Sequence, residues 1–262
     1  MQLVSAKTRK TRPDSAEWQA RVDLAAAHRL AHVQGFSEGI FNHLTLAVPG
    51  KRGRYYQIPF GLHWSEVTAS CLLEVECDTG RVLSGAGEVE RSAYCIHAPM
   101  HKLLPENCAA VFHTHMPYAS ALARLEDPRI EPIGQTEIAF LEETAYDDQY
   151  TGLALDPAEG ARLAGVLGPK KTVLFMANHG VCVTGATVAE AYDRLFYLER
   201  ACQVQLYAMW TGQRRKAVSP TVVQHTLAQY ADSPSYGGKP ACDHHFAALK
   251  RMLDRQSPDY AD

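Results

Sequence analysis

Hydrophobic positions recur with helical spacing in some segments and form short apolar runs in others. Residues 14–34 have apolar residues three and four apart after an acidic start and end at Gly35, which predicts the first helix. The same spacing predicts further helices at 91–104, 118–125, 156–167, 187–209 and 246–253. Apolar runs between glycine and proline residues predict strands at 40–49, 55–59, 72–77, 82–83, 109–115, 172–176 and 181–183. Strands interleaved with helices predict a three-layer α/β/α fold.

The length of the chain favours one domain. The chain has 262 residues, and α/β proteins of this length often form a single domain. We expect a flexible tail at 1–13 and one domain over 14–262. Within it, 212–262 forms an extension that packs on the body or on a neighbouring subunit. Residues 146–152 are expected to be a loop, and 212–240, rich in Ser, Pro and Gly, an irregular segment.

Composition narrows the possible partners. The net charge is −3, so no basic surface for nucleic acid is expected. No apolar run reaches the roughly 18 to 20 residues that a membrane span needs. The chain also begins without the apolar centre of a secretory signal. Its seven scattered cysteines lack a C-x-x-C pair and are typical of buried thiols in a reducing compartment, so a cytoplasmic location is expected.

Three histidines suggest a metal centre. His113 and His115 lie two residues apart on a predicted strand, so their side chains project from the same face. His179 follows another apolar run and precedes Gly180, at a predicted strand end. Ordinary polar surface or loop positions would also explain each histidine separately. Three histidine ligands with one open position are what a catalytic divalent cation requires.

Several motifs resemble the class II aldolase/adducin superfamily. They occur in the family's order, at Gly39–Leu44 with Val48–Gly50, Val111–His115, and Asn178–Val181 with Gly185 and the helix Glu190–Glu199. The resemblance implies an α/β/α fold around a mixed, largely antiparallel sheet and a homo-oligomer, commonly a tetramer. It also implies one divalent metal per chain held by His113, His115 and His179. Zinc is the first expectation, with manganese or another divalent cation as alternatives.

The chain departs from sugar-phosphate aldolases of that family at one position. They carry a Ser-Ser-Glu about twenty residues before H-x-H, whereas this chain has Ser92-Ala93-Tyr94 there. Glu88 and Glu90 are the nearest carboxylates, and only a shift of register would bring either into the site. Residues 93–101 and 199–206 instead resemble the adducin-like bacterial branch, which includes decarboxylases of hydroxylated aromatic acids.

The missing carboxylate shifts the expected chemistry. Aldol cleavage needs a placed acid or base, while decarboxylation depends mainly on a metal that stabilises the charge left behind. We therefore predict a metal-dependent lyase for a small hydroxy or oxo carboxylic acid or a hydroxy-carbonyl compound, with decarboxylation favoured. A sugar-phosphate aldolase or epimerase and a non-catalytic adducin-like interaction module are the alternatives. The predicted partner is a small-molecule substrate.

Two histidines and a tyrosine are the catalytic candidates. His97 and His101 are four residues apart and would share a helix face, although Pro99 makes that register uncertain. Two interpretations are open. In one, one histidine is a fourth metal ligand and the other a proton shuttle; in the other, both lie on a partly exposed helix face. Tyr150 follows the acidic pair in the predicted loop and is a weaker candidate for proton donation.

Three further residues are candidates for substrate binding. Asn42 and His43 correspond to the family loop that lines the substrate pocket. Gly61 corresponds to a family loop that contacts substrate phosphate, but the next residues are Leu62, His63 and Trp64. This bulkier loop favours a planar or carboxylated substrate over a sugar phosphate.

Overall fold

A computed structural model describes residues 15–232 and 235–262. The expected tail at 1–13 lies outside the described residues. One eight-stranded sheet has the order β4-β3-β2-β1-β5-β8-β7-β6. The strands are β1 (His43–Ala47), β2 (Arg54–Gln57), β3 (Leu73–Glu76), β4 (Val82–Ser84), β5 (Ala110–Thr114), β6 (Thr144–Asp147), β7 (Val173–Met176) and β8 (Gly180–Gly185). Only β6 and β7 pair in parallel, so the predicted mixed, largely antiparallel sheet is confirmed.

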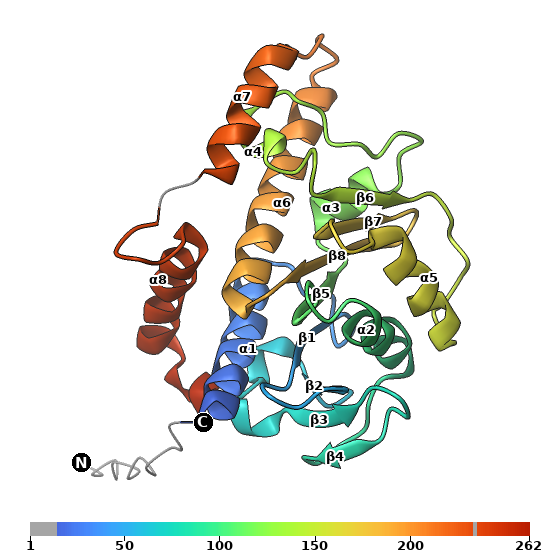
Figure 1. Ribbon diagram of the computed structural model, residues 1–262, viewed down its shortest axis with the longest axis vertical. Helices are drawn as coiled ribbons and strands as arrows, with labels where there is room; N and C mark the ends of the chain where they lie inside the picture. Colours follow the sequence, from blue (N-terminus) through green and yellow to red (C-terminus); the bar gives the residue numbers. More distant parts are fainter. Residues whose placement is uncertain (1–14, 233–234) are drawn as a thin grey trace, which may run out of the picture.

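Helices cover both faces of the sheet, as the α/β/α prediction requires. In Figure 1, α1, α6 and α8 lie on one side of the sheet, and α2 and α5 lie on the other. The α-helices are α1 (Ala16–Val33), α2 (Arg91–Leu103), α3 (Pro117–Leu122), α4 (Gln135–Ile138), α5 (Pro157–Leu167), α6 (Val188–Trp210), α7 (Pro220–Ala231) and α8 (Ala241–Gln256). Short 3₁₀ helices span Trp64–Glu66, Ala69–Cys71 and Pro258–Ala261. No helix in the described ranges is both long and apolar enough to cross a membrane.

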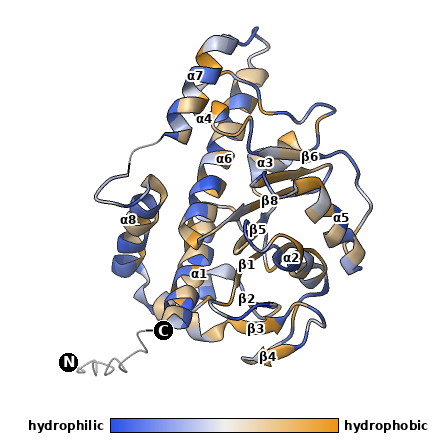
Figure 2. Cartoon of the chain, viewed as in Figure 1, coloured by the Kyte–Doolittle hydropathy of each residue, from blue (hydrophilic) through white to orange (hydrophobic). Residues whose placement is uncertain are grey.

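Strand β5 lies at the centre of the core and is buried on both faces. Phe112 packs in the hydrophobic cluster beneath α1 and α6, whereas Val111 packs in the cluster beneath α2 and α5. Because strand side chains alternate, His113 shares the α2 side of the sheet with Val111. Figure 2 shows that hydrophilic residues cover much of the outward side of α8, which agrees with its position as an outer layer.

Helices α2 and α5 approach each other closely. A Cβ on Gly160 of α5 would lie 2.0 Å from the backbone oxygen of Cys95 in α2, so only glycine fits there. Pro99 lies inside α2, and the helix still continues to Leu103. This contact holds α2 against the face of the sheet that carries His113.

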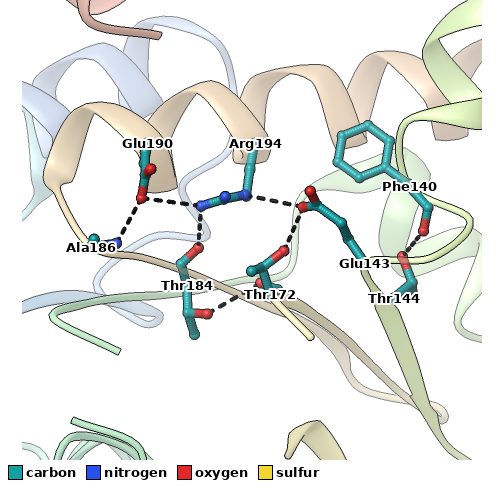
Figure 3. Close-up of polar contacts among 8 residues, drawn as sticks. All are labelled: Phe140, Glu143, Thr144, Thr172, Thr184, Ala186, Glu190 and Arg194. Atoms are coloured by element: carbon teal, nitrogen blue, oxygen red, sulfur yellow. Dashed lines mark hydrogen bonds and ion pairs between the residues drawn. The ribbon is translucent and has the colours of Figure 1, made fainter. Parts of the chain in front are cut away.

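Polar contacts fix α6 to the end of the sheet opposite the histidines. Figure 3 shows Arg194 of α6 donating to the Thr184 carbonyl of β8 at 3.1 Å and to the Glu143 carboxylate at 3.2 Å. Glu143 also accepts from Thr172 Oγ1 at 2.6 Å, next to the start of β7. Thr187 caps α6 by accepting from Glu190 N at 3.1 Å, as the capping pattern T-x-x-E indicates.

Two predictions about irregular segments were wrong. Residues 144–147 form β6, although the segment around Tyr146 was expected to be a loop. This segment is extended because it pairs in parallel with β7, and its sequence has no strand pattern that would indicate this pairing. Part of the expected irregular segment at 212–240 forms α7, which begins with Pro220 in its first turn, a position where proline costs no hydrogen bond. The last helix is also longer than expected, spanning Ala241–Gln256.

Candidate metal centre

The three predicted histidines converge at one end of the sheet. No two of their candidate ligand nitrogens are more than 4.8 Å apart, and their ring centroids lie 4.8–5.0 Å from each other. Nitrogens bound at about 2.0–2.1 Å around one tetrahedral zinc lie about 3.4 Å apart, and separations of at most 4.8 Å are compatible with one shared cation. His113 and His115 come from β5 and the residue after it, and His179 comes from the β7–β8 turn.

Hydrogen bonds orient two of the rings. Nδ1 of His113 donates to the Val181 carbonyl at 3.0 Å, and Nδ1 of His115 donates to the Glu38 carboxylate. Each bond leaves Nε2 as the free ligand nitrogen, the arrangement common to metal-bound histidines. Nε2 of His115 is buried and has no hydrogen-bond partner in the described chain. An unpartnered buried imidazole nitrogen beside two other histidines fits a bound cation.

Burial keeps the rings of His113 and His179 neutral. Burial, reinforced by the neighbouring charges of His115 and Arg124, lowers the pKa of His179 to about 4. Burial and the other histidines hold the pKa of His113 well below its ordinary value. Neutral imidazole is the form that binds metal, so His113 and His179 are in the ligand form at neutral pH.

Asn42 and His43 line the cavity beside the histidines, and their predicted substrate-binding role stays a prediction. Asn42 has a φ of 69° and its side-chain oxygen accepts from the backbone N–H of His115 at 3.0 Å, so it also positions a ligand. His43 pairs directly with His113 across β1 and β5, which places both on one face of the sheet. Burial lowers the pKa of His43 to about 4, against the opposing effect of Glu90.

Glu90 lies in the cavity, although the sequence comparison required a register shift to bring it there. It caps the start of α2 and lies 4.0 Å from Nε2 of His43. Burial opposes its ionisation, but hydrogen bonds from Ser92 Oγ at 2.5 Å and from Ala93 N at 2.7 Å, together with His43, keep its pKa below the ordinary value. The cavity therefore contains an ionised carboxylate, although the sequence motif predicted none there.

His97 and His101 are buried behind the site and do not line the cavity. Nδ1 of His101 donates to the Cys108 carbonyl at 2.7 Å, which leaves its Nε2 to accept from Thr45 Oγ1 at 2.8 Å. Because the Thr45 hydroxyl donates its hydrogen to His101, its oxygen accepts a hydrogen bond from Nδ1 of His97 at 2.7 Å. The two histidines share a helix face, as expected, and hold α2 on β1. Their predicted catalytic roles remain predictions.

Tyr150 lines the cavity, with its ring 6.4 Å from that of His179. Gly61 is exposed, has a φ of 88° and does not line the cavity. Trp64 is fully buried and packs edge-on to His28 at 5.2 Å, so this aromatic ring belongs to the core and not to a substrate loop.

The cavity beside the histidines has a volume of about 440 Å³. Three charged residues in its lining were not singled out from sequence as site residues: Glu38, Glu90 and Arg124. Glu38 and Arg124 belong to no motif, and their roles depend on contacts with residues distant in the chain. Glu90 carried one usable signal, because it stands immediately before the predicted start of a helix.

The fold and the histidine cluster define an α/β protein with an open cavity beside three histidines that could hold a metal ion. The family model described as Class II Aldolase and Adducin N-terminal domain matches residues 22–206. The chain belongs to this family, and the predicted resemblance is confirmed.

Similar proteins extend over nearly the whole chain. A Caulobacter vibrioides protein with a provisional aldolase class 2 name is 33% identical, and the alignment covers 97% of this chain and 96% of that protein. Decarboxylase NovR from Streptomyces niveus is 29% identical, covering 91% and 88% respectively. The crystal structure of an aldolase II superfamily protein from Pseudomonas syringae is 34% identical, covers 96% and 97%, and has a TM-score of 0.85.

Proposed function

We propose that this protein is a metal-dependent carbon–carbon lyase for a small hydroxy or oxo carboxylic acid, with decarboxylation favoured over aldol cleavage. The convergence of His113, His115 and His179 at an open cavity is the observation that carries the proposal. When bound, a divalent cation would polarise a substrate oxygen and stabilise negative charge that develops on it. An interaction module without chemistry would have no need for three converging histidines at a cavity.

Two observations favour decarboxylation of an acid over cleavage of a sugar phosphate. A relative that aligns with most of the chain is named as a decarboxylase. In addition, Arg124 is the only lysine or arginine among the residues that line the cavity, and the Gly61 loop lies outside it. A phosphate site normally combines several cationic or backbone donors.

Aldol cleavage is the second candidate, and Glu90 favours it. In decarboxylation, the electrons of the broken C–C bond pass to the neighbouring carbonyl, carbon dioxide leaves and the remaining enolate takes one proton. Aldol cleavage also requires removal of a hydroxyl proton before the bond breaks. The ionised Glu90 carboxylate in the cavity is a suitable base for that step.

The cation, assembly and location are further parts of the proposal. Zinc is proposed first, because three histidines and one open position are typical of catalytic zinc. A homotetramer in the cytoplasm is proposed from family resemblance. Exposed Tyr197, Tyr207 and Trp210 on α6 support a subunit contact, and seven free cysteines support a reducing compartment.

The experiment measures metal content and carbon dioxide release on tag-free protein. In a panel of 3-oxo acids and 4-hydroxy-2-oxo acids, wild type should contain about one equivalent of divalent metal and release carbon dioxide from the 3-oxo acids, while His115→Ala should lose both. His225→Ala is the matched control, because His225 is exposed on α7 and absent from the cluster. A wild-type protein that binds no added zinc would refute the proposal. Aldehyde release without carbon dioxide would select aldol cleavage.

A further inference from the structure

One wall of the metal cavity is apolar and faces solvent. Phe41, Leu153 and Leu155 line it with exposed fractions of 52%, 79% and 54%. Ile96 and Ala154 continue the same lining toward the core. Large apolar side chains left exposed around a site favour binding of an apolar group, because covering them removes that surface from water.

Among the described residues that line the cavity, Arg124 is the only lysine or arginine, and it lies beside this wall. Arg124 uses Nη1 to donate to the backbone carbonyls of Ser120 at 2.6 Å and His179 at 3.2 Å. These bonds hold the guanidinium at the cavity next to a predicted metal ligand. Among the described residues, no carboxylate lies within 4.0 Å of it, whereas seven other described arginines are paired with a carboxylate. Its remaining N–H donors are therefore available to an acidic ligand.

We propose that Arg124 binds the carboxylate of the substrate and that the Phe41–Leu153–Leu155 wall binds an aryl or branched alkyl group on the same molecule. The substrate class is then a hydroxy or oxo acid with a large apolar substituent. This inference rests on the proposed lyase function and narrows it. Arg124 is a specificity-determining residue, and the three histidines would hold the cation that the hydroxy or oxo oxygens chelate.

The test compares three matched probes on zinc-loaded protein by isothermal titration calorimetry. They are 3-phenyllactate, lactate, which has only a methyl group in place of the benzyl group, and 3-phenyl-1,2-propanediol, which lacks the carboxylate. Wild type should bind 3-phenyllactate at least about tenfold more tightly than either other compound, since burial of a phenyl ring or pairing of a charge is worth that factor. Arg124→Met should remove the preference over the diol, and Leu153→Ser should reduce the preference over lactate by at least about threefold.

Matched controls separate these roles from structural ones. Arg129→Met removes an exposed arginine that pairs with Asp127 away from the cavity, and its preferences should equal those of wild type. Equal binding of the three probes, or no binding, to zinc-loaded and catalytically active wild type would overturn the inference but leave the lyase function standing. Loss of zinc from Arg124→Met would show that Arg124 holds the His179 turn instead. A changed assembly size in Leu153→Ser with unchanged preferences would make the wall a subunit interface.

Discussion

Replacing Glu38 with alanine should weaken metal binding without touching a ligand. The Glu38 carboxylate accepts the Nδ1 hydrogen of His115, which fixes the ring and directs Nε2 toward the other histidines. Loss of such an outer partner costs about 10- to 100-fold in metal affinity. At about 1.4 kcal/mol per factor of ten, this is about 1.4–2.7 kcal/mol. The Glu38 side chain is 60% exposed, so the metal-free fold should lose little stability.

The assay is zinc titration of metal-free protein against a chromophoric chelator. Glu38→Gln should lie between wild type and Glu38→Ala, because its amide oxygen still accepts the hydrogen bond but carries no charge. Glu126→Ala, which removes another exposed carboxylate, is the control. Wild-type affinity in Glu38→Ala would refute the reasoning. A fall of more than about 1 kcal/mol in the unfolding free energy of its metal-free form would indicate a structural role.

Two further predictions concern packing and pH. Gly180→Ala should lower zinc affinity in the chelator assay, since the new Cβ would lie 2.6 Å from the Thr114 carbonyl oxygen and 2.7 Å from Cδ2 of His115; unchanged affinity would contradict this. Burial lowers the pKa of His28 from 6.5 to about 3, so the unfolded chain binds more protons and stability is lost as pH falls from 6.5 toward 3. His28→Phe should reduce this slope, measured by denaturant unfolding at pH 7, 6 and 5, by up to about 1.4 kcal/mol per pH unit, and an identical slope would exclude the titration of His28.

The sequence predicted the elements with strong local signals. Helix α6 carries a capping residue, Thr187, and a long amphipathic pattern, so its start and length were readable. Strand β6 was missed because Thr144–Asp147 neither alternates nor forms an apolar run, and its extended form depends on parallel pairing with β7. Helix α7 was hidden by the flanking Ser, Pro and Gly residues, although Pro220 suits a first helical turn.

By itself, the sequence determined the family and predicted the three-histidine cluster. His113 and His115 are adjacent along a strand, where alternation alone places both on one face, and the ordered motifs added His179. Only the tertiary structure decided what surrounds them. Glu38, Glu90 and Arg124 come from three separate segments and reach the cavity through the pairing of β1 with β5 and the packing of α2. Contacts between residues far apart in the chain leave no periodic signal, because local spacing records only the backbone geometry of one element.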